Sequence, residues 1–186
     1  MAEFTIHDAE TAPDGSKPLL DGATAKFGFT PNLVGVLADS PAALKAYLAI
    51  NGAVAETSLN PTEQQVVLLA ASFENGGTYD MAAHSTVSEK IGVPADVVES
   101  LRAGGSIADP KLNALAEFTR ATVRNNGVVD DGATATFLTA GYTSVSILDV
   151  VTAIAQKLIS SYVTHFADIQ ADDAFAPKAW EKPTSP

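Results

Sequence analysis

The sequence predicts an all-α fold, and three observations support this expectation. Proline follows a helix-capping residue at Ser40-Pro41, Asn60-Pro61 and Asp109-Pro110, and proline is favoured at the first helical position because its missing N–H would have had no partner there. Residues 144–167 carry apolar side chains at helical spacing. No segment alternates between apolar and polar residues as a half-buried strand would.

The chain is expected to contain one helical domain with an extension at each end. Residues 1–16 are rich in Asp, Glu, Thr, Gly and Pro, which is typical of a loosely held arm. Residues 17–170 form the predicted domain. Residues 171–186 are expected to be an irregular tail in which Phe175 and Trp180 act as packing anchors.

The helices within the domain follow from caps, prolines and glycines. Asn60 with a glutamate three residues later matches a capping box, Gly76-Gly77 marks a break after which Thr78 can cap a new helix, and Gly141 suits a helix end. The predicted helices cover 16–27, 32–38, 41–56, 61–74, 78–91, 94–103, 110–124, about 130–140 and 144–167. The last of these is the best specified, and its polar residues indicate a buried helix rather than a membrane span.

Composition excludes several classes of function. The 186 residues include 22 Asp+Glu against 11 Lys+Arg, a net charge of −11 without a basic cluster, so binding to nucleic acid or to an anionic membrane surface is not expected. There is no cysteine, which removes disulfides, thiolate metal sites and thiol catalysis. The N-terminal residues do not resemble a secretory signal, and a cytoplasmic location is expected.

The segment from Glu74 to Ile91 holds the candidate site. Asp80 and His84 are four residues apart, so their side chains share one face of a helix. A carboxylate beside an imidazole is a plausible acid/base pair. The structural alternatives are that Asp80 meets the partial positive charge at the helix start, worth about 0.3–1 kcal/mol, and that His84 is a packed core histidine.

Other motifs are weak or missing. The sequence has no G-x-S-x-G, P-loop, H-E-x-x-H or G-x-G-x-x-G pattern. His165 suits a helix C-terminus, where its charge would be favourable, and His7 is expected to be exposed. A metal site made of Asp80, His84 and His165 lacks strong ligand spacing, so no metal and no cofactor is expected.

The segment ENGGTYDMAAHS resembles the core motif of the carboxymuconolactone decarboxylase and alkylhydroperoxidase D superfamily, a family associated with antioxidant defence. The segments FTPNLVGVLADSPAALKAYLAINGAV, SLNPTEQQVV, AGYTSVSILDVV and YVTHFAD extend the resemblance, in its peroxidase-related branch, from about residue 20 to residue 170. The resemblance implies an alkylhydroperoxidase D-like helical bundle that assembles as a homo-oligomer, a trimer or hexamer, with the motif helix bordering a pocket near a subunit interface.

The same resemblance argues against peroxidase activity. Peroxidase members use a glutamate, two cysteines in CxxC spacing and a histidine, and these positions fall on Gln65, Gly77, Asp80 and His84. Only the histidine remains, so no thiolate can attack a peroxide O–O bond. The decarboxylase branch also lacks the cysteine pair and keeps a histidine at the matching helix position.

The expected function is therefore acid/base chemistry on a small carboxylated or lactone-like metabolite. In this interpretation the catalytic residues are His84, its orienting partner Asp80 and the further candidate Glu74, and the pocket is lined by Gln65, Tyr79 and His165. The alternative is a non-catalytic small-molecule binder or scaffold with a decayed peroxidase site. A weaker third option is metal-dependent chemistry that uses the histidines.

Overall fold

The computed structural model describes residues 3–184, and within that part of the chain it shows helices and no strand. The elements are α1 (Lys17–Phe27), α2 (Asn32–Leu37), α3 (Pro41–Ala55), α4 (Pro61–Asn75), α5 (Thr78–Lys90), α6 (Ala95–Arg102), α7 (Pro110–Arg124), α8 (Asp131–Thr139), α9 (Ser144–Ala167) and the short 3-10 helix η1 (Ala176–Lys178). The all-α prediction is confirmed.

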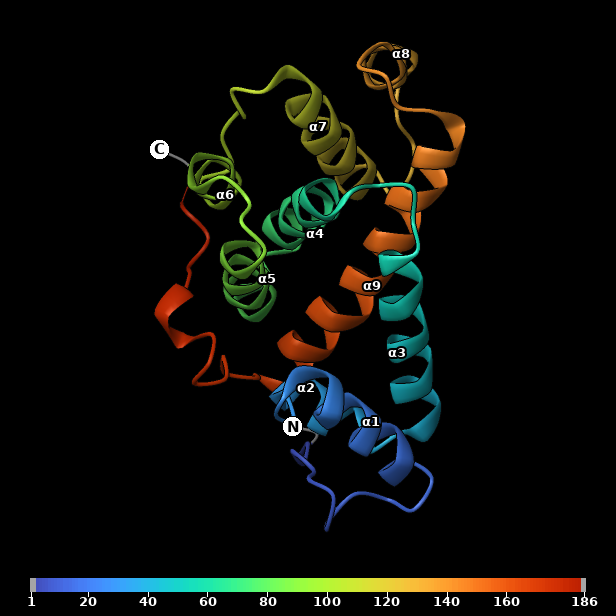
Figure 1. Ribbon diagram of the computed structural model, residues 1–186, viewed down its shortest axis with the longest axis vertical. Coiled ribbons are helices and arrows are strands. Elements are labelled where there is room, and N and C mark those ends of the chain that lie inside the picture. Colours follow the sequence, from blue (N-terminus) through green and yellow to red (C-terminus); the bar gives the residue numbers. More distant parts are fainter. Residues whose placement is uncertain (1–2, 185–186) are drawn as a thin grey trace.

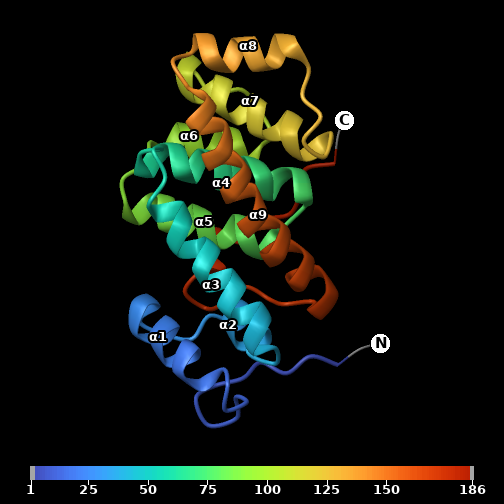
Figure 2. The same cartoon turned by 90° about the vertical axis from the view of Figure 1, so that its right-hand side faces the viewer.

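The longest helix, α9, runs through the fold and joins its two ends. In Figures 1 and 2, α1 and α2 lie at one end and α7 and α8 at the other, while α3 and α4 pack along α9 between them. α4 is enclosed by α5, α6, α7 and α9, and every residue from position 65 to position 72 is buried. The helix therefore supplies the centre of the main hydrophobic core.

The predicted capping residues make the expected hydrogen bonds. The side chains of Ser40, Asn60 and Asp109 accept bonds from backbone N–H groups in the first turns of α3, α4 and α7. Asn60 and Glu63 form the complete capping box that their spacing predicts. Each such cap satisfies a donor that the helix itself leaves unpaired.

The Gly-Gly break differs from the expectation in one respect. Gly76 ends α4 in the left-handed region, with φ 66°, and α5 begins at Thr78 with Gly77 as its N-cap and without a side-chain cap from Thr78. A Cβ atom at Gly77 would lie 3.0 Å from both Asp80 Oδ2 and Ser161 Oγ. Glycine at this position therefore leaves room for the contact between α5 and α9.

The N-terminal arm is held more firmly than its composition suggests. The backbone N–H of His7 donates to the Gly35 carbonyl, and the His7 ring lies 2.7 Å from an Asp39 carboxylate oxygen. Ala12 and Ser16 are buried. His7 is therefore partly buried rather than exposed, because Gly35 and Asp39, far along the chain, supply its contacts.

The C-terminal tail is also fastened to the domain, and both expected anchors pack. Phe175 lies edge-on against Tyr79, with ring centroids 5.9 Å apart. The Trp180 ring packs on Phe73 at 5.8 Å, and its Nε1 donates to the Arg102 carbonyl at 2.9 Å. The tail therefore covers α5 and the end of α6.

We expect Trp180→Ala to lower the free energy of unfolding by about 2 kcal/mol, roughly half the cost of truncating a fully buried tryptophan. Urea unfolding followed by circular dichroism measures the change. Limited proteolysis should then cut the tail earlier than in the wild type. An unchanged urea midpoint together with an unchanged cleavage rate would show that the ring does not hold the tail.

Candidate active site

The candidate site lies where α5 faces α9. Asp80 and His84 are one turn apart on α5, as their spacing predicts, and Lys157 and Ser161 are one turn apart on α9. Asp80 Oδ1 accepts a hydrogen bond from Lys157 Nζ at 2.7 Å, and Oδ2 accepts one from Ser161 Oγ at 2.7 Å. Both carboxylate oxygens are therefore occupied by α9.

Lys157 and Asp80 form a buried ion pair, with 0% and 2% of their residue surfaces exposed. Burial opposes ionisation of Asp80, but the charge of Lys157 and the hydrogen bonds from Lys157 and Ser161 outweigh it and hold the pKa of the carboxyl below its usual value. The removal of two charges from water is costly, so such a pair depends on complete hydrogen bonding.

His84 is tied to the same lysine rather than to Asp80. Its Nε2 lies 2.7 Å from Lys157 Nζ and its Nδ1 lies 3.0 Å from Gln65 Oε1. An ammonium group can only donate, so Nε2 accepts and the proton sits on Nδ1, which donates to Gln65. Burial, with the nearby charge of Lys157, lowers the pKa of His84 to about 3, and the ring is neutral at pH 7.

A cavity of about 140 Å³ opens beside these side chains. Its polar part is formed by Tyr47, Asn51, Asp80, His84, Gln156 and Lys157, with the exposed Lys90 at its edge. Its apolar wall comes mainly from Phe27, Phe29, Pro31, Leu33, Val34, Val87 and Phe175. The C-terminal tail thus contributes to the wall through Phe175, and the acid/base side chains line the same cavity as the apolar ones.

The structure gathers four of the six predicted site residues. Asp80 and His84 line the cavity and Gln65 holds His84 from α4. Tyr79 also lines the cavity, but its hydroxyl donates to Asp172 at 2.6 Å, and burial with that carboxylate raises its pKa far above the ordinary value. Tyr79 therefore fixes the tail rather than titrating near neutral pH.

Glu74 and His165 lie elsewhere. Both oxygens of Glu74 accept from the Arg124 guanidinium, at 2.7 and 2.8 Å. His165 Nε2 donates to the Gly76 carbonyl at 3.2 Å and lines a different hollow, next to Trp180. The structure does not bring these two side chains to the cavity, and no three His, Asp or Glu side chains among residues 3–184 are grouped as metal ligands.

Sequence reasoning missed the central residue of the site, Lys157, together with Ser161 and Gln156. A signal was present: α9 reaches a mean hydropathy of 1.2 over 18 residues, apolar enough to span a membrane by length and composition, yet it carries a lysine in its middle. In the structure 44% of that window is buried inside the fold. The helix is therefore only partly buried, and its polar stripe marks the face that meets Asp80 and His84.

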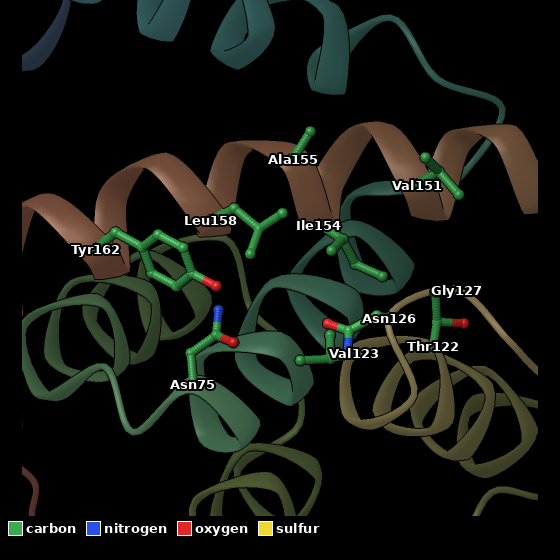
Figure 3. Close-up of a pocket in the computed structure, with 10 residues that line it drawn as sticks. All are labelled: Asn75, Thr122, Val123, Asn126, Gly127, Val151, Ile154, Ala155, Leu158 and Tyr162. Carbon is green, nitrogen blue, oxygen red and sulfur yellow. The ribbon is translucent and has the colours of Figure 1, made fainter.

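A second hollow, of about 330 Å³, lies along the outer side of α9. Figure 3 shows Ile154 and Tyr162 projecting from α9 toward the end of α7 and toward Asn75, with Val151 and Leu158 on the same helix. Its other lining residues are Thr122, Val123, Asn126, Gly127 and Ala155. The lining holds no carboxylate, imidazole or amine, so this hollow is less suited to proton transfer than the cavity beside Lys157.

No family model and no curated protein matches the chain, but solved structures do. An uncharacterized peroxidase-related protein from Silicibacter sp. TM1040 aligns over 94% of this chain and 95% of its own, with a TM-score of 0.78 and 16% identity. An uncharacterized peroxidase-related protein from Ralstonia eutropha JMP134, described as an alkylhydroperoxidase AhpD core, aligns over 93% of both chains, with a TM-score of 0.77 and 21% identity.

The debrominase Bmp8, solved with 2,3,4-tribromopyrrole, is a further similar structure. It aligns over 96% of this chain and 95% of its own, with a TM-score of 0.79 and 14% identity. At such identities the likeness concerns the fold. The chain has the alkylhydroperoxidase D-like fold, in agreement with the resemblance of its motif segments.

Proposed function

We propose that this chain, which has the alkylhydroperoxidase D-like fold, performs acid/base chemistry on a small carboxylated or lactone-like metabolite rather than peroxide reduction. One observation carries the proposal. Lys157, Asp80 and His84 are in contact beside a small, largely apolar cavity, in a chain without cysteine. The site is equipped to hold and move a proton and has no thiol for attack on a peroxide.

The hydrogen bonds favour Lys157 as the proton donor. Loss of CO₂ from a carboxylated substrate leaves an electron pair on carbon, and a proton must reach that carbon. His84 is neutral. Its Nε2 atom accepts from Lys157 and its one N–H group, at Nδ1, donates to Gln65, so it is not free to act as a proton donor. Lys157 donates from Nζ, Asp80 stabilises its charge, and His84 positions the amine. We therefore propose Lys157 as the donor, a role that the sequence predicts for His84.

Two further observations support a small, acidic, ring-sized substrate. Lys90 lies at the edge of the cavity, and within residues 3–184 it forms no ion pair, so its ammonium group can meet a substrate carboxylate. Bmp8, which has the same fold, was solved with the single-ring compound 2,3,4-tribromopyrrole. The cavity of this chain, of about 140 Å³, is of the size that holds a single ring.

The test is turnover of a panel of ring-sized carboxylic acids and lactones, followed by NMR, with wild type and Lys157→Arg. Arginine keeps the positive charge beside Asp80 but does not release its proton near neutral pH. We expect the rate constant for turnover to fall about 100-fold or more, with substrate affinity changed only a few-fold. Lys90→Met should instead weaken binding of the carboxylates. Equal turnover by Lys157→Arg and wild type would refute the assignment.

The second candidate is a non-catalytic binder. It is favoured because Gln65 stands where the resemblance places the relay glutamate, and Gly77 and Asp80 stand where it places the two cysteines. Saturable binding of panel compounds without turnover would support the binder, and no binding at all would support a scaffold. Thermal stabilisation distinguishes these outcomes, because a ligand at about 100 times its dissociation constant stabilises the native state by about 2.7 kcal/mol.

We also propose that the outer side of α9 joins copies of this chain. Large apolar side chains are exposed along it, at Val145, Leu148, Val151, Leu158, Tyr162 and Phe166. Exposed apolar patches of this kind typically mark interaction surfaces, and the resemblance of the sequence implies trimers or hexamers.

Phe166→Glu is expected to shift the protein toward monomer, because Phe166 is 79% exposed and a charge there opposes burial in an interface. Light scattering after gel filtration measures the mass. Ile91→Glu is the control, since Ile91 is 48% exposed and lies at the end of α5 rather than on α9. A monomeric wild type, or equal masses for both variants, would contradict the proposed surface.

A further inference from the structure

Gln156 is a buried side chain whose amide oxygen is available to accept a hydrogen bond. It precedes Lys157 on α9, is 1% exposed and lines the cavity beside Lys157. Within residues 3–184 its Oε1 atom has no donor. A buried acceptor without a partner typically costs about 1–3 kcal/mol, so a group that enters the cavity and donates a hydrogen bond to Oε1 gains affinity from an acceptor that is already desolvated.

The surroundings of Gln156 define the shape of that group. Gln156 and Tyr47 both line the cavity, and Phe27, Phe29 and Phe175 contribute aromatic side chains to its wall. The volume is about 140 Å³, close to the roughly 150 Å³ that holds one benzene molecule in another protein. The cavity therefore accommodates a single ring.

The charge of the cavity defines the donor. Asp80 is already neutralised by Lys157 and bonded by Ser161, and the remaining charged group, Lys90, is a cation. A cationic ligand would be repelled by Lys157 and Lys90 without a free carboxylate to compensate. A neutral hydroxyl or N–H group is therefore favoured over an ammonium as the partner of Oε1.

We infer that Gln156 is a specificity residue that selects ring-sized ligands bearing a hydroxyl or N–H group, by accepting a hydrogen bond from that group at Oε1. The inference deepens the proposed function and rests on it for the location of the site and for the carboxylate at Lys90. It requires binding but no turnover, so it can be tested apart from the chemistry.

The experiment compares hydroxybenzoates with methylbenzoates of the same substitution pattern, at the 2, 3 and 4 positions, by NMR titration or calorimetry. The two members of each pair have similar shapes and differ in the donor. We expect wild type to bind at least one hydroxybenzoate about 10-fold more tightly than its methyl counterpart, the effect of one buried hydrogen bond. In Gln156→Leu the ratio of dissociation constants should fall to about 1.

Gln64→Leu is the matched control. It is the same substitution on α4, where Gln64 bonds to Thr57 and to the Leu59 carbonyl outside the cavity, and the hydroxyl preference should persist. Circular dichroism verifies that each variant folds. An equal preference in wild type and Gln156→Leu, an absence of any preference, or no binding of any member of the panel at millimolar concentration would overturn the inference. Discrimination without turnover of any compound would refute only the proposed chemistry.

Discussion

Lys157→Met is expected to lower the free energy of unfolding by about 3–5 kcal/mol. Methionine fills much of the volume of the lysine stem, so the loss comes mainly from charge. Without Lys157, the Asp80 carboxylate remains buried with Ser161 as its remaining hydrogen-bond donor. The Nε2 atom of His84 loses its donor as well. An uncompensated buried charge is among the few single changes that destabilise a domain by this much.

Urea unfolding of wild type, Lys157→Met and the double variant Asp80→Asn/Lys157→Met tests this expectation. The double variant should regain a large part of the lost stability, because the remaining amide carries no charge. Lys17→Met is the control, since the Lys17–Asp14 pair lies on the surface and its removal should leave the urea midpoint unchanged. A Lys157→Met variant as stable as wild type would show that the buried pair does not contribute to stability.

Local signals explain why the helices could be predicted and the centre of the site could not. The cap at Asn60 and the helical spacing of the apolar residues in α9 depend on residues that are close in the chain. The placement of Asp80 and His84 on one helix face likewise follows from their spacing of four residues. The contact between Asp80 and Lys157 joins residues 77 positions apart. Nothing in a single sequence places one of these side chains against the other.

The residues that were expected in the site and lie outside it show the same limit. Glu74 precedes the motif helix, but the break at Gly76 separates it from α5, and it meets Arg124 of α7 instead. His165 shares α9 with Lys157, but eight positions separate them and His165 is exposed near the end of the helix. Nearness in sequence gives a common site only when the intervening backbone directs the side chains to one place.

The pH dependence of stability should report the environment of His84. The pKa of His84 is about 3 in the folded state and about 6.5 in an unfolded chain. Between these values the unfolded chain binds a proton that the folded chain does not, so stability falls as the pH falls. This contribution should reduce the free energy of unfolding by about 2.5 kcal/mol between pH 7 and pH 4.5.

His84→Gln isolates that contribution, because glutamine can accept from Lys157 and donate to Gln65 but does not titrate. Urea unfolding at pH 7 and at pH 4.5 should show a smaller loss in the variant than in wild type, by about the same 2.5 kcal/mol. Protonation of Asp80 does not affect the comparison, because its pKa is lowered in the folded state and the stability lost on its protonation is therefore lost below about pH 4. His7 and His165 are present in both proteins. An equal loss in both would mean that His84 titrates as a solvated histidine, and that Lys157 does not hold its Nε2 atom.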